Sequence, residues 1–296
     1  MTSVTDGELQ PQPLAAGDGG IDAAPDGAIR RRRSAKLIVG LGILCVYVIM
    51  AVLAPVVAPY NPLAQQIPDA LAHPSLHHLL GTDQLGRDVL SRIIYGARVD
   101  LVAATAASVG ACMVGTLIGL LTGYAGGWLD VALTRVMDMV QTIPSFTLLL
   151  VLLLVLGPGA RSLVIALIVT HWVVYARLIR GSVLTLRSQD FISAAWLAGL
   201  RVPRILLRHL LPNVGRQAVT YLASDIILAV TAIASLGYLG IGIQPPTAEW
   251  GSMINDGQDF LSRNWWLSVA PGVVVVLLGL GLALVSDSFN ERKDRL

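Results

Sequence analysis

Charged residues are scarce in this chain. Asp, Glu, Lys and Arg make up only 14% of 296 residues, whereas 54% of the residues are hydrophobic, and soluble globular proteins carry ~25% charged residues. The mean hydropathy is correspondingly high, at +0.68. This composition argues against a soluble enzyme and indicates an integral membrane protein. A net charge of +2 is too small to suggest a nucleic-acid partner.

Lysine is almost absent, and this excludes one chemistry. The two lysines follow Ala35 and Arg292, so no Gly-Lys-Ser/Thr sequence exists and the chain cannot hydrolyse ATP through a P-loop of its own. His-Glu-x-x-His and Gly-x-Ser-x-Gly motifs are also missing. We therefore predict no catalytic residue and no cofactor bound by this chain.

Cysteine is equally rare, and neither copy suggests a site. Cys45 and Cys112 both lie within apolar runs, which implies no disulfide framework. Three of the five histidines, His73, His77 and His78, are close in sequence. A metal site there is conceivable, but it lacks nearby cysteines or a defined carboxylate, so none is predicted.

Long apolar runs are what the chain does contain. The first runs from Leu37 to about Val57, and others are delimited by ionisable residues: 29 uncharged positions follow Asp100, 22 follow Asp138 and 23 follow Arg263. A helix needs ~20 apolar residues to cross a bilayer. A shorter run of 15 positions follows Arg161, and a fifth span contains or follows Asp225. We predict an all-α bundle of about six transmembrane helices.

The distribution of basic residues predicts the orientation. With a cytoplasmic N-terminus, 16 of the 21 Lys and Arg residues fall in cytoplasmic segments, as the positive-inside rule requires. Both termini are therefore predicted to be cytoplasmic. Residues 1–29 are rich in Ala, Gly, Pro and Asp and are expected to form a disordered tail, and residues 30–296 form the transmembrane domain.

The first long loop, residues 58–100, is predicted to be external. After Gly81, the pair Thr82 and Asp83 is expected to cap a helix with an apolar side and an opposite polar side. The interpretation stays open between an interfacial or packing helix and a functional one. The residues singled out here are Gly81, Thr82, Asp83, Gly86, Arg87 and Asp88.

The second long loop, residues 181–216, is predicted to be cytoplasmic and carries the most specific pattern. Asp190 is expected to cap a short helix over 191–198, whose small residues would let another surface approach closely, and Gly199 would end it. A second helix would begin at Pro203 and end at Pro212. Such a helix-turn-helix suits docking of a partner. The candidate residues are Asp190, Phe191, Ser193, Ala194, Ala195, Gly199, His209, Leu211, Pro212 and Asn213.

The third long loop, residues 237–266, is predicted to be external. Glycines followed by Gln244, Pro245 and Pro246 should turn the chain, and a short helix is expected around 250–260. Trp250, Trp265 and Trp266 are interpreted as members of an interfacial aromatic belt.

Asp225 is the one acidic residue expected within a span. An intramembrane carboxylate indicates a pathway residue or the packing partner of an arginine such as Arg177 or Arg180. If the fifth helix instead begins near Asp225, the carboxylate lies at the interface and needs no partner. Both interpretations stay open.

Three stretches together resemble a known family. Asp190 to Gly199 followed by Arg208 to Asn213 resembles the EAA loop of bacterial ABC importer permeases, with nine residues between Gly199 and the ending that closes in Leu-Pro. The stretches 78–98 and 235–251 look like parts of the C-type subunit of dipeptide, oligopeptide and nickel permeases. One departure is Ser193, where the motif usually has Glu, and it removes a charge that could pair with an arginine at the docking site or cap a helix.

The resemblance implies a type I importer permease in the bacterial inner membrane. It would form half of a pathway for di- or oligopeptides together with a second permease. It would dock on two cytoplasmic ATPase subunits, which carry the ATP and Mg, and an external binding protein would deliver substrate. Besides these proteins only membrane lipid is expected as a partner. The alternative is an ion-gradient-driven secondary transporter, which predicts coupling carboxylates in several spans.

Overall fold

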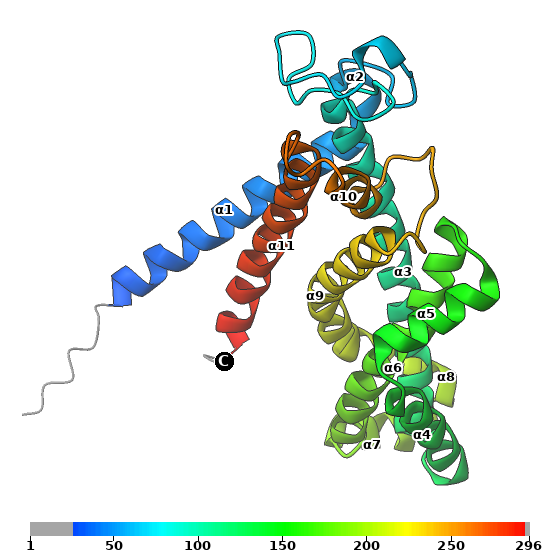
Figure 1. The fold of residues 1–296 in the computed structure, drawn as a ribbon. Helices are drawn as coiled ribbons and strands as arrows, with labels where there is room; N and C mark the ends of the chain where they lie inside the picture. The colour runs from blue at the N-terminus through cyan, green and yellow to red at the C-terminus, as the bar shows by residue number, and fades with distance from the viewer. Residues whose placement is uncertain (1–25, 294–296) are drawn as a thin grey trace, which may run out of the picture.

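A computed structural model describes residues 26–293 of the chain, and within them all regular structure is helical. Long helices run between two ends of the molecule (Figure 1). At one end lies the loop after α2, with α10 beside it; at the other lie α4, α7 and α8. The helices are α1 Asp26–Val52, α2 Ala54–Val57, η1 Ile67–Asp69, α3 Val89–Ala125, α4 Gly127–Thr142, α5 Ser145–Leu156, α6 Ala160–Leu186, α7 Asp190–Leu197, α8 Val202–Ile205, η2 Leu206–Leu210, α9 Leu211–Tyr238, α10 Trp250–Gln258 and α11 Trp266–Lys293.

The predicted spans agree with the helices, with one break. Five stretches are long and apolar enough to cross a membrane, and the α4–α5 pair would make a sixth. These two helices meet at 91°. Pro144 causes the break, because proline lacks an N–H and pushes the preceding Ile143 into an extended conformation, at ψ 127°. α5 alone has 12 residues, about 18 Å of rise, which is too short for a bilayer.

α3 and α6 pack most closely, through glycines spaced four apart. A Cβ added at Gly115 would clash with the carbonyl oxygen of Trp172, and one at Gly119 would clash with that of Ala176. Small residues at this spacing let helix backbones approach in a membrane, where packing replaces the hydrophobic effect. α3 also contacts α1, α9 and α11, so it joins α6 to the rest of the bundle.

The second helix of the 181–216 segment does not end where the sequence suggested. Pro212 and Asn213 were expected to end it, but α8, the π-helix η2 and α9 form one continuous span from Val202 to Tyr238. The π-helix lies directly before Pro212, where the chain must accommodate the missing N–H. Asn213 Nδ2 donates to the His209 carbonyl at 2.6 Å, so both residues belong to the helix rather than to a break.

α1 crosses α11 at one side of the bundle (Figure 1). Gly40 lies against the backbone of Gly281, and Tyr47 Oη donates to the Val274 carbonyl at 2.5 Å. α1 begins at Asp26, so residues 26–29 of the predicted tail are helical, and residues 1–25 lie outside the described part of the chain. The orientation of the termini stays a prediction.

Candidate functional site: a coupling segment and a cap at opposite ends

The segment 181–216, here called the coupling segment, contains the predicted short helix and its stop. α7 spans Asp190–Leu197 and Gly199 follows at φ +74°. The Gly199 amide donates to the Trp196 carbonyl at 3.0 Å, and the Leu200 amide donates to that of Ala195 at 3.2 Å. This is the Schellman arrangement, which needs a left-handed residue and therefore favours glycine. Nothing lies within 4 Å of a Cβ built there, so the requirement is conformational rather than steric.

Two details of α7 differ from the prediction. Gln189, not Asp190, precedes the helix, and no side chain caps it. Ala195 is only 7% exposed and packs with Ile205 and Leu210, so its small size serves the interior of the segment rather than a docking surface. The predicted surface consists instead of residues on the outer side of α7, which are Asp190, Phe191, Ser193, Ala194, Trp196 and Leu197.

Large apolar side chains dominate that outer side. Leu197 is 85% exposed, Trp196 67% and Phe191 43%. They lie beyond the membrane-crossing part of α6, at the end of the molecule shared with α4. Exposed apolar clusters of this kind outside a bilayer mark protein interaction sites.

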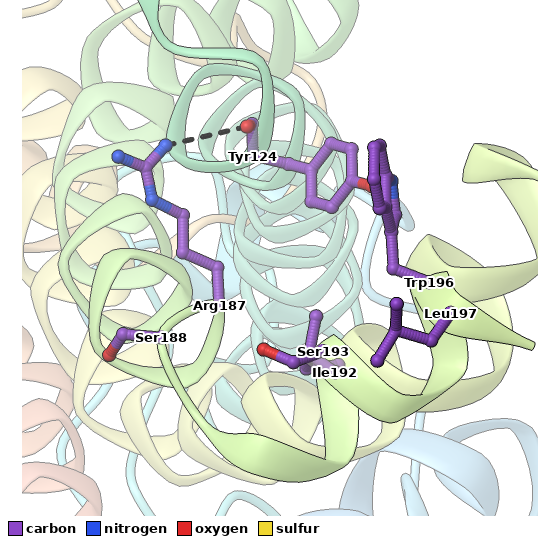
Figure 2. Close-up of a pocket in the computed structure, with 7 residues that line it drawn as sticks. All are labelled: Tyr124, Arg187, Ser188, Ile192, Ser193, Trp196 and Leu197. Carbon is purple, nitrogen blue, oxygen red and sulfur yellow. Dashed lines mark hydrogen bonds between the residues drawn. The ribbon is translucent and has the colours of Figure 1, made fainter.

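A groove of about 510 Å³ runs beside α7 (Figure 2). Arg187 forms one wall, with Nη1 donating to the carbonyls of Gly123 at 3.1 Å and Tyr124 at 3.4 Å. These carbonyls end α3, so the guanidinium stabilises the negative end of that helix. Ser193 lines the same groove as Arg187. Ser193 carries no charge, and Arg187 is bound to the end of α3.

The ending of the predicted motif lies in the continuous helix. His209 and Leu211 are half-buried, and Pro212 and Asn213 are exposed. Leu211 packs against the buried cluster that contains Ile192 and Leu206. This ending therefore holds α7 against the start of α9.

The opposite end of the molecule carries what we call the cap, residues 58–88 and 237–266. Thr82 and Asp83 do not cap a helix there, because Thr82 pairs with Asp88 in an isolated antiparallel bridge and Gly86 turns the chain at φ +71°. Asp88 is the true N-cap of α3, accepting from the Ser91 amide at 2.8 Å. The predicted amphipathic helix is the first part of α3 itself, and it is not a separate interfacial helix.

The predicted polar side of that helix is buried. Arg87, Asp88, Ser91 and Arg92 are all at most 4% exposed. Asp83 Oδ2 accepts from Arg87 Nε at 2.6 Å and lies 3.5 Å from Arg92 Nε. The periodicity of the sequence could not predict this burial, because it depends on opposite charges that come together only inside the folded cap.

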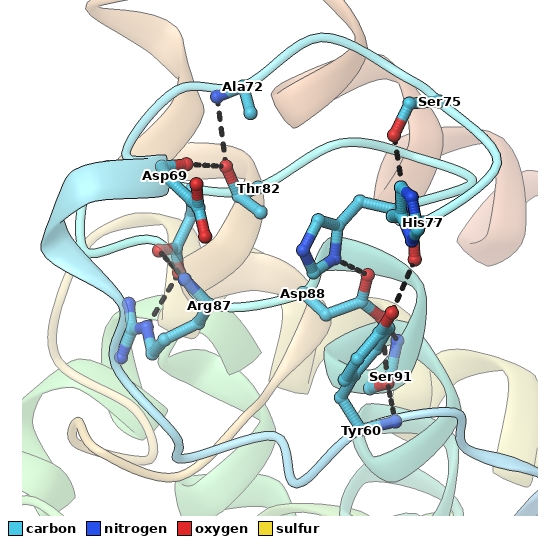
Figure 3. Close-up of polar contacts among 11 residues, drawn as sticks. Tyr60, Asp69, Ala72, Ser75, His77, Thr82, Arg87, Asp88 and Ser91 are labelled. Atoms are coloured by element: carbon cyan, nitrogen blue, oxygen red, sulfur yellow. Dashed lines mark hydrogen bonds and ion pairs between the residues drawn. The ribbon is translucent and has the colours of Figure 1, made fainter.

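The three clustered histidines have separate partners and do not converge on a metal. His78 Nδ1 lies 2.9 Å from Asp88 Oδ1, the His77 carbonyl accepts from Tyr60 Oη at 2.7 Å, and the His73 ring packs on Trp266 (Figure 3 draws the first two contacts). In the described part of the chain no group of three or more metal-ligating side chains occurs. Figure 3 also shows Thr82 Oγ1 joining Asp69 and Ala72 across the loop.

α10 closes the cap from the other side. Trp250 is fully buried, with its indole N–H donating to the Ile93 carbonyl at 3.0 Å and its amide to Asp100 Oδ2 at 3.1 Å. It is therefore a core residue, and its interpretation as part of an aromatic belt was wrong. Trp266 is also buried, at 8% exposure, whereas Trp265 is 58% exposed.

Glu249 is the N-cap of α10, a role that the sequence analysis did not predict. Its two carboxylate oxygens accept from the amides of Gly251 at 2.6 Å and Ser252 at 2.7 Å. Burial raises the pKa of Glu249 to about 7, against the lowering effect of these hydrogen bonds. The residues before it, Gln244, Pro245 and Pro246, are exposed in the turn, where Gln244 Nε2 donates to the Gly240 carbonyl at 3.0 Å.

Asp225 is embedded rather than interfacial. It lies in the middle of α9, 1% exposed, with Oδ1 2.7 Å from His171 Nδ1 and Oδ2 accepting from Tyr175 Oη at 3.1 Å. The arginines considered as its partners bind elsewhere, Arg177 to Asp138 and Arg180 to Asp130. His171 and Tyr175 lie one helical turn apart on α6, a spacing that could have identified them as a pair.

Comparison with known families decides the identity of the chain. The family described as "Binding-protein-dependent transport system inner membrane component" matches residues 115–295. The chain belongs to this family. A second model, "N-terminal TM domain of oligopeptide transport permease C", matches residues 28–74. This inner membrane component is thus a multi-pass ABC importer permease, a transport subunit rather than an enzyme.

Several permeases are similar over most of their length. The dipeptide transport system permease protein DppC of Alkalihalophilus pseudofirmus is 34% identical, covering 90% of this chain and 88% of that one. The di/tripeptide permease DppC of Pseudomonas aeruginosa is 36% identical, with 86% of both chains covered. The oligopeptide permease OppC of Bacillus subtilis is 32% identical, covering 90% and 88%.

Two solved structures share the fold. One is an inward-facing MetNI methionine ABC transporter, with a TM-score of 0.54 and 17% identity over 67% of this chain and 94% of that chain. The other is an amino acid ABC transporter, with a TM-score of 0.52 and 16% identity over 69% and 94%. These likenesses support the all-helical permease fold.

Proposed function

We propose that this permease imports di- or oligopeptides as half of a translocation pathway completed by a second permease. Two cytoplasmic ATPase subunits would supply the ATP and Mg chemistry, and an external binding protein would deliver the peptide. The named relatives support the substrate class, since each is a peptide permease. An ion-gradient-driven transporter has no such support.

The observation that carries the proposal is the exposed apolar surface of α7. Trp196 and Leu197 project from a short helix whose position is fixed by the Gly199 turn on one side and by the buried cluster of Ile192 and Ile205 on the other. An ATPase subunit seated on this surface and in the adjacent groove would cover them. Movement of that subunit would then pass to α6 and α9 as rigid bodies.

The cap would receive the binding protein. Its buried ion pairs and the tightly packed Trp250 give it a fixed shape, which suits docking of a preformed partner. Its exposed loop residues Gln244, Pro245 and Pro246 are the candidates for contact.

Substitution on α7 tests the ATPase interaction. Leu197→Asp or Trp196→Ala should lower the amount of ATPase that co-purifies with this chain at least tenfold. Loss of a central aromatic or apolar anchor costs about 2 kcal/mol or more of binding free energy, which weakens the affinity on the order of thirtyfold. The matched control is Trp128→Ala, which removes an equally prominent tryptophan, 80% exposed, from α4. ATPase recovery that is unchanged by both α7 variants would refute the docking surface.

A further inference from the structure

One groove lies away from both the coupling segment and the centre of the cap. It has a volume of about 560 Å³ and runs between the early part of α3 and the first turns of α6. Apart from two arginines its walls are apolar. The lining residues are Arg98, Val99, Val102, Ala103, Ala106, Ala160, Arg161, Val164 and Ile165.

Neither of the two arginines has a hydrogen-bond or ion-pair partner among the described residues, which distinguishes them from four arginines of the same bundle. Arg177 and Arg180 pair with aspartates, Arg87 pairs with Asp83, and Arg187 binds carbonyls. Arg98 and Arg161 are exposed, and no hydrogen bond or ion pair to either occurs among the described residues. Two guanidinium groups at one groove therefore present ten N–H donors that no described group of the chain accepts.

Their depth in the membrane follows from helix geometry. From Arg98 to the end of α3 at Ala125 the helix rises about 40 Å, and from Arg161 to the end of α6 at Leu186 about 38 Å. A bilayer including its headgroups is about 40–45 Å thick. When the far ends of α3 and α6 lie at one headgroup level, both arginines lie at the other, and the apolar wall points into the hydrocarbon.

We propose that this groove binds an anionic phospholipid. The phosphate would sit between Arg98 and Arg161, because the planar guanidinium fork matches phosphate oxygens, and an acyl chain would lie along Val102, Ala106 and Ile165. A zwitterionic lipid carries a positive headgroup next to the same phosphate, so two arginines select the anionic form. These arginines also lie on the predicted external side, where the positive-inside bias disfavours them.

Lipid titration of the purified complex tests the site. The full chain, extracted with its accompanying subunits and delipidated, is titrated with phosphatidylglycerol and with phosphatidylcholine of the same acyl chains, and bound lipid is counted by native mass spectrometry. The parent should prefer phosphatidylglycerol. In the double variant Arg98→Gln/Arg161→Gln this preference should fall roughly thirtyfold, since each arginine near the headgroups contributes about a factor of five.

Two further variants keep the test specific. Arg263→Gln removes another arginine that is exposed and predicted to be external, and it should leave the preference unchanged. Ala106→Trp fills the groove while keeping both arginines, and it should weaken binding of phosphatidylglycerol. The proposal is overturned if the parent binds both lipids equally or if the double variant keeps the preference. It is also overturned if Val102→Cys forms a disulfide with a cysteine of a second permease, which would show that protein covers the groove.

Discussion

Three buried carboxylates in the cap each hold the start of a turn or helix. Asp83, Asp88 and Glu249 each accept backbone amides at the start of a turn or helix, and each is at most 7% exposed. An acidic side chain at a helix start stabilises free N–H groups and the positive end of the helix. Asp83 and Asp88 also have basic partners in Arg87 and His78, whereas the carboxylate of Glu249 accepts from two backbone amides and has no ion pair among the described residues.

Glu249 should make the cap sensitive to pH. Its pKa is raised by burial from 4.5 to about 7, so the folded state holds a proton that the unfolded state releases between these values. The contribution of Glu249 to stability is therefore fully present below pH 4.5 and falls as pH rises from 4.5 to 7, by up to about 3 kcal/mol. Asp100 and Asp256, which lie near this carboxylate, would add to the loss when charged.

Melting temperatures of the parent and of Glu249→Gln at pH 5 and pH 8 measure this effect. The parent should lose more stability than the variant between the two values, because glutamine does not titrate. Equal losses in both proteins would show that Glu249 does not contribute.

Asp225 should be far more important to stability than an exposed aspartate. Removing Asp225 leaves the ring nitrogen of His171 and the hydroxyl of Tyr175 without their acceptor, at a cost of about 1–3 kcal/mol for each, whereas exposed pairs contribute about 0–1 kcal/mol. The matched control is Asp138, which pairs with Arg177 at 2.6 Å although both side chains are more than 40% exposed. Asp225→Ala should therefore lower the melting temperature of the purified complex strongly, and Asp138→Ala hardly at all.

Comparable melting temperatures for the two variants would contradict this account. They would indicate that the contacts of Asp225 with His171 and Tyr175 contribute little to holding α6 against α9.

At the scale of elements, the coupling segment depends on one left-handed turn. Gly199→Ala should destabilise the turn by about 1 kcal/mol, because a side chain at φ +74° is strained even in open space. Gly215→Ala is the control, since this helical glycine of α9 also has nothing within 4 Å and alanine favours the helix by up to about 1 kcal/mol. Hydrogen exchange across residues 190–205 should be faster in the first variant only.

Peptide uptake should follow the same order. Gly199→Ala should reduce uptake at normal expression while the bundle stays folded, and Gly215→Ala should not. Normal uptake with a loosened turn would mean that α7 is a passive connection.

The spans, the short helix α7 and its glycine stop could be predicted because each rests on local chemistry. Apolar length marks a span, and Gly199 marks a left-handed turn. The burial of Arg87, Arg92 and Trp250 could not be predicted, since it depends on α10 packing over α3 from 150 residues away. The prediction that a helix ends at Pro212 was wrong, because the π-helix before this proline lets the helix continue.

At the scale of the molecule, the cap and the coupling segment are joined by long helices. α3 begins at the cap and ends at the carbonyls that bind Arg187. α9 runs from the coupling segment back to the cap, where Gly237 lies against Glu249. A displacement of α7 therefore has a continuous helical route to the opposite end. Such a route is what the proposed function requires of a subunit that receives an ATPase at one end and a binding protein at the other.

Isolation of the chain from its native membrane in mild detergent, with mass spectrometry of the accompanying proteins, tests whether it is one subunit of an ABC importer. We expect a second six-helix permease, ATPases with Walker motifs, and a binding protein whose bound ligand is a peptide. Recovery of the chain alone or as a homo-oligomer, while a control importer survives the same extraction, would show that it does not work as a subunit of such an importer.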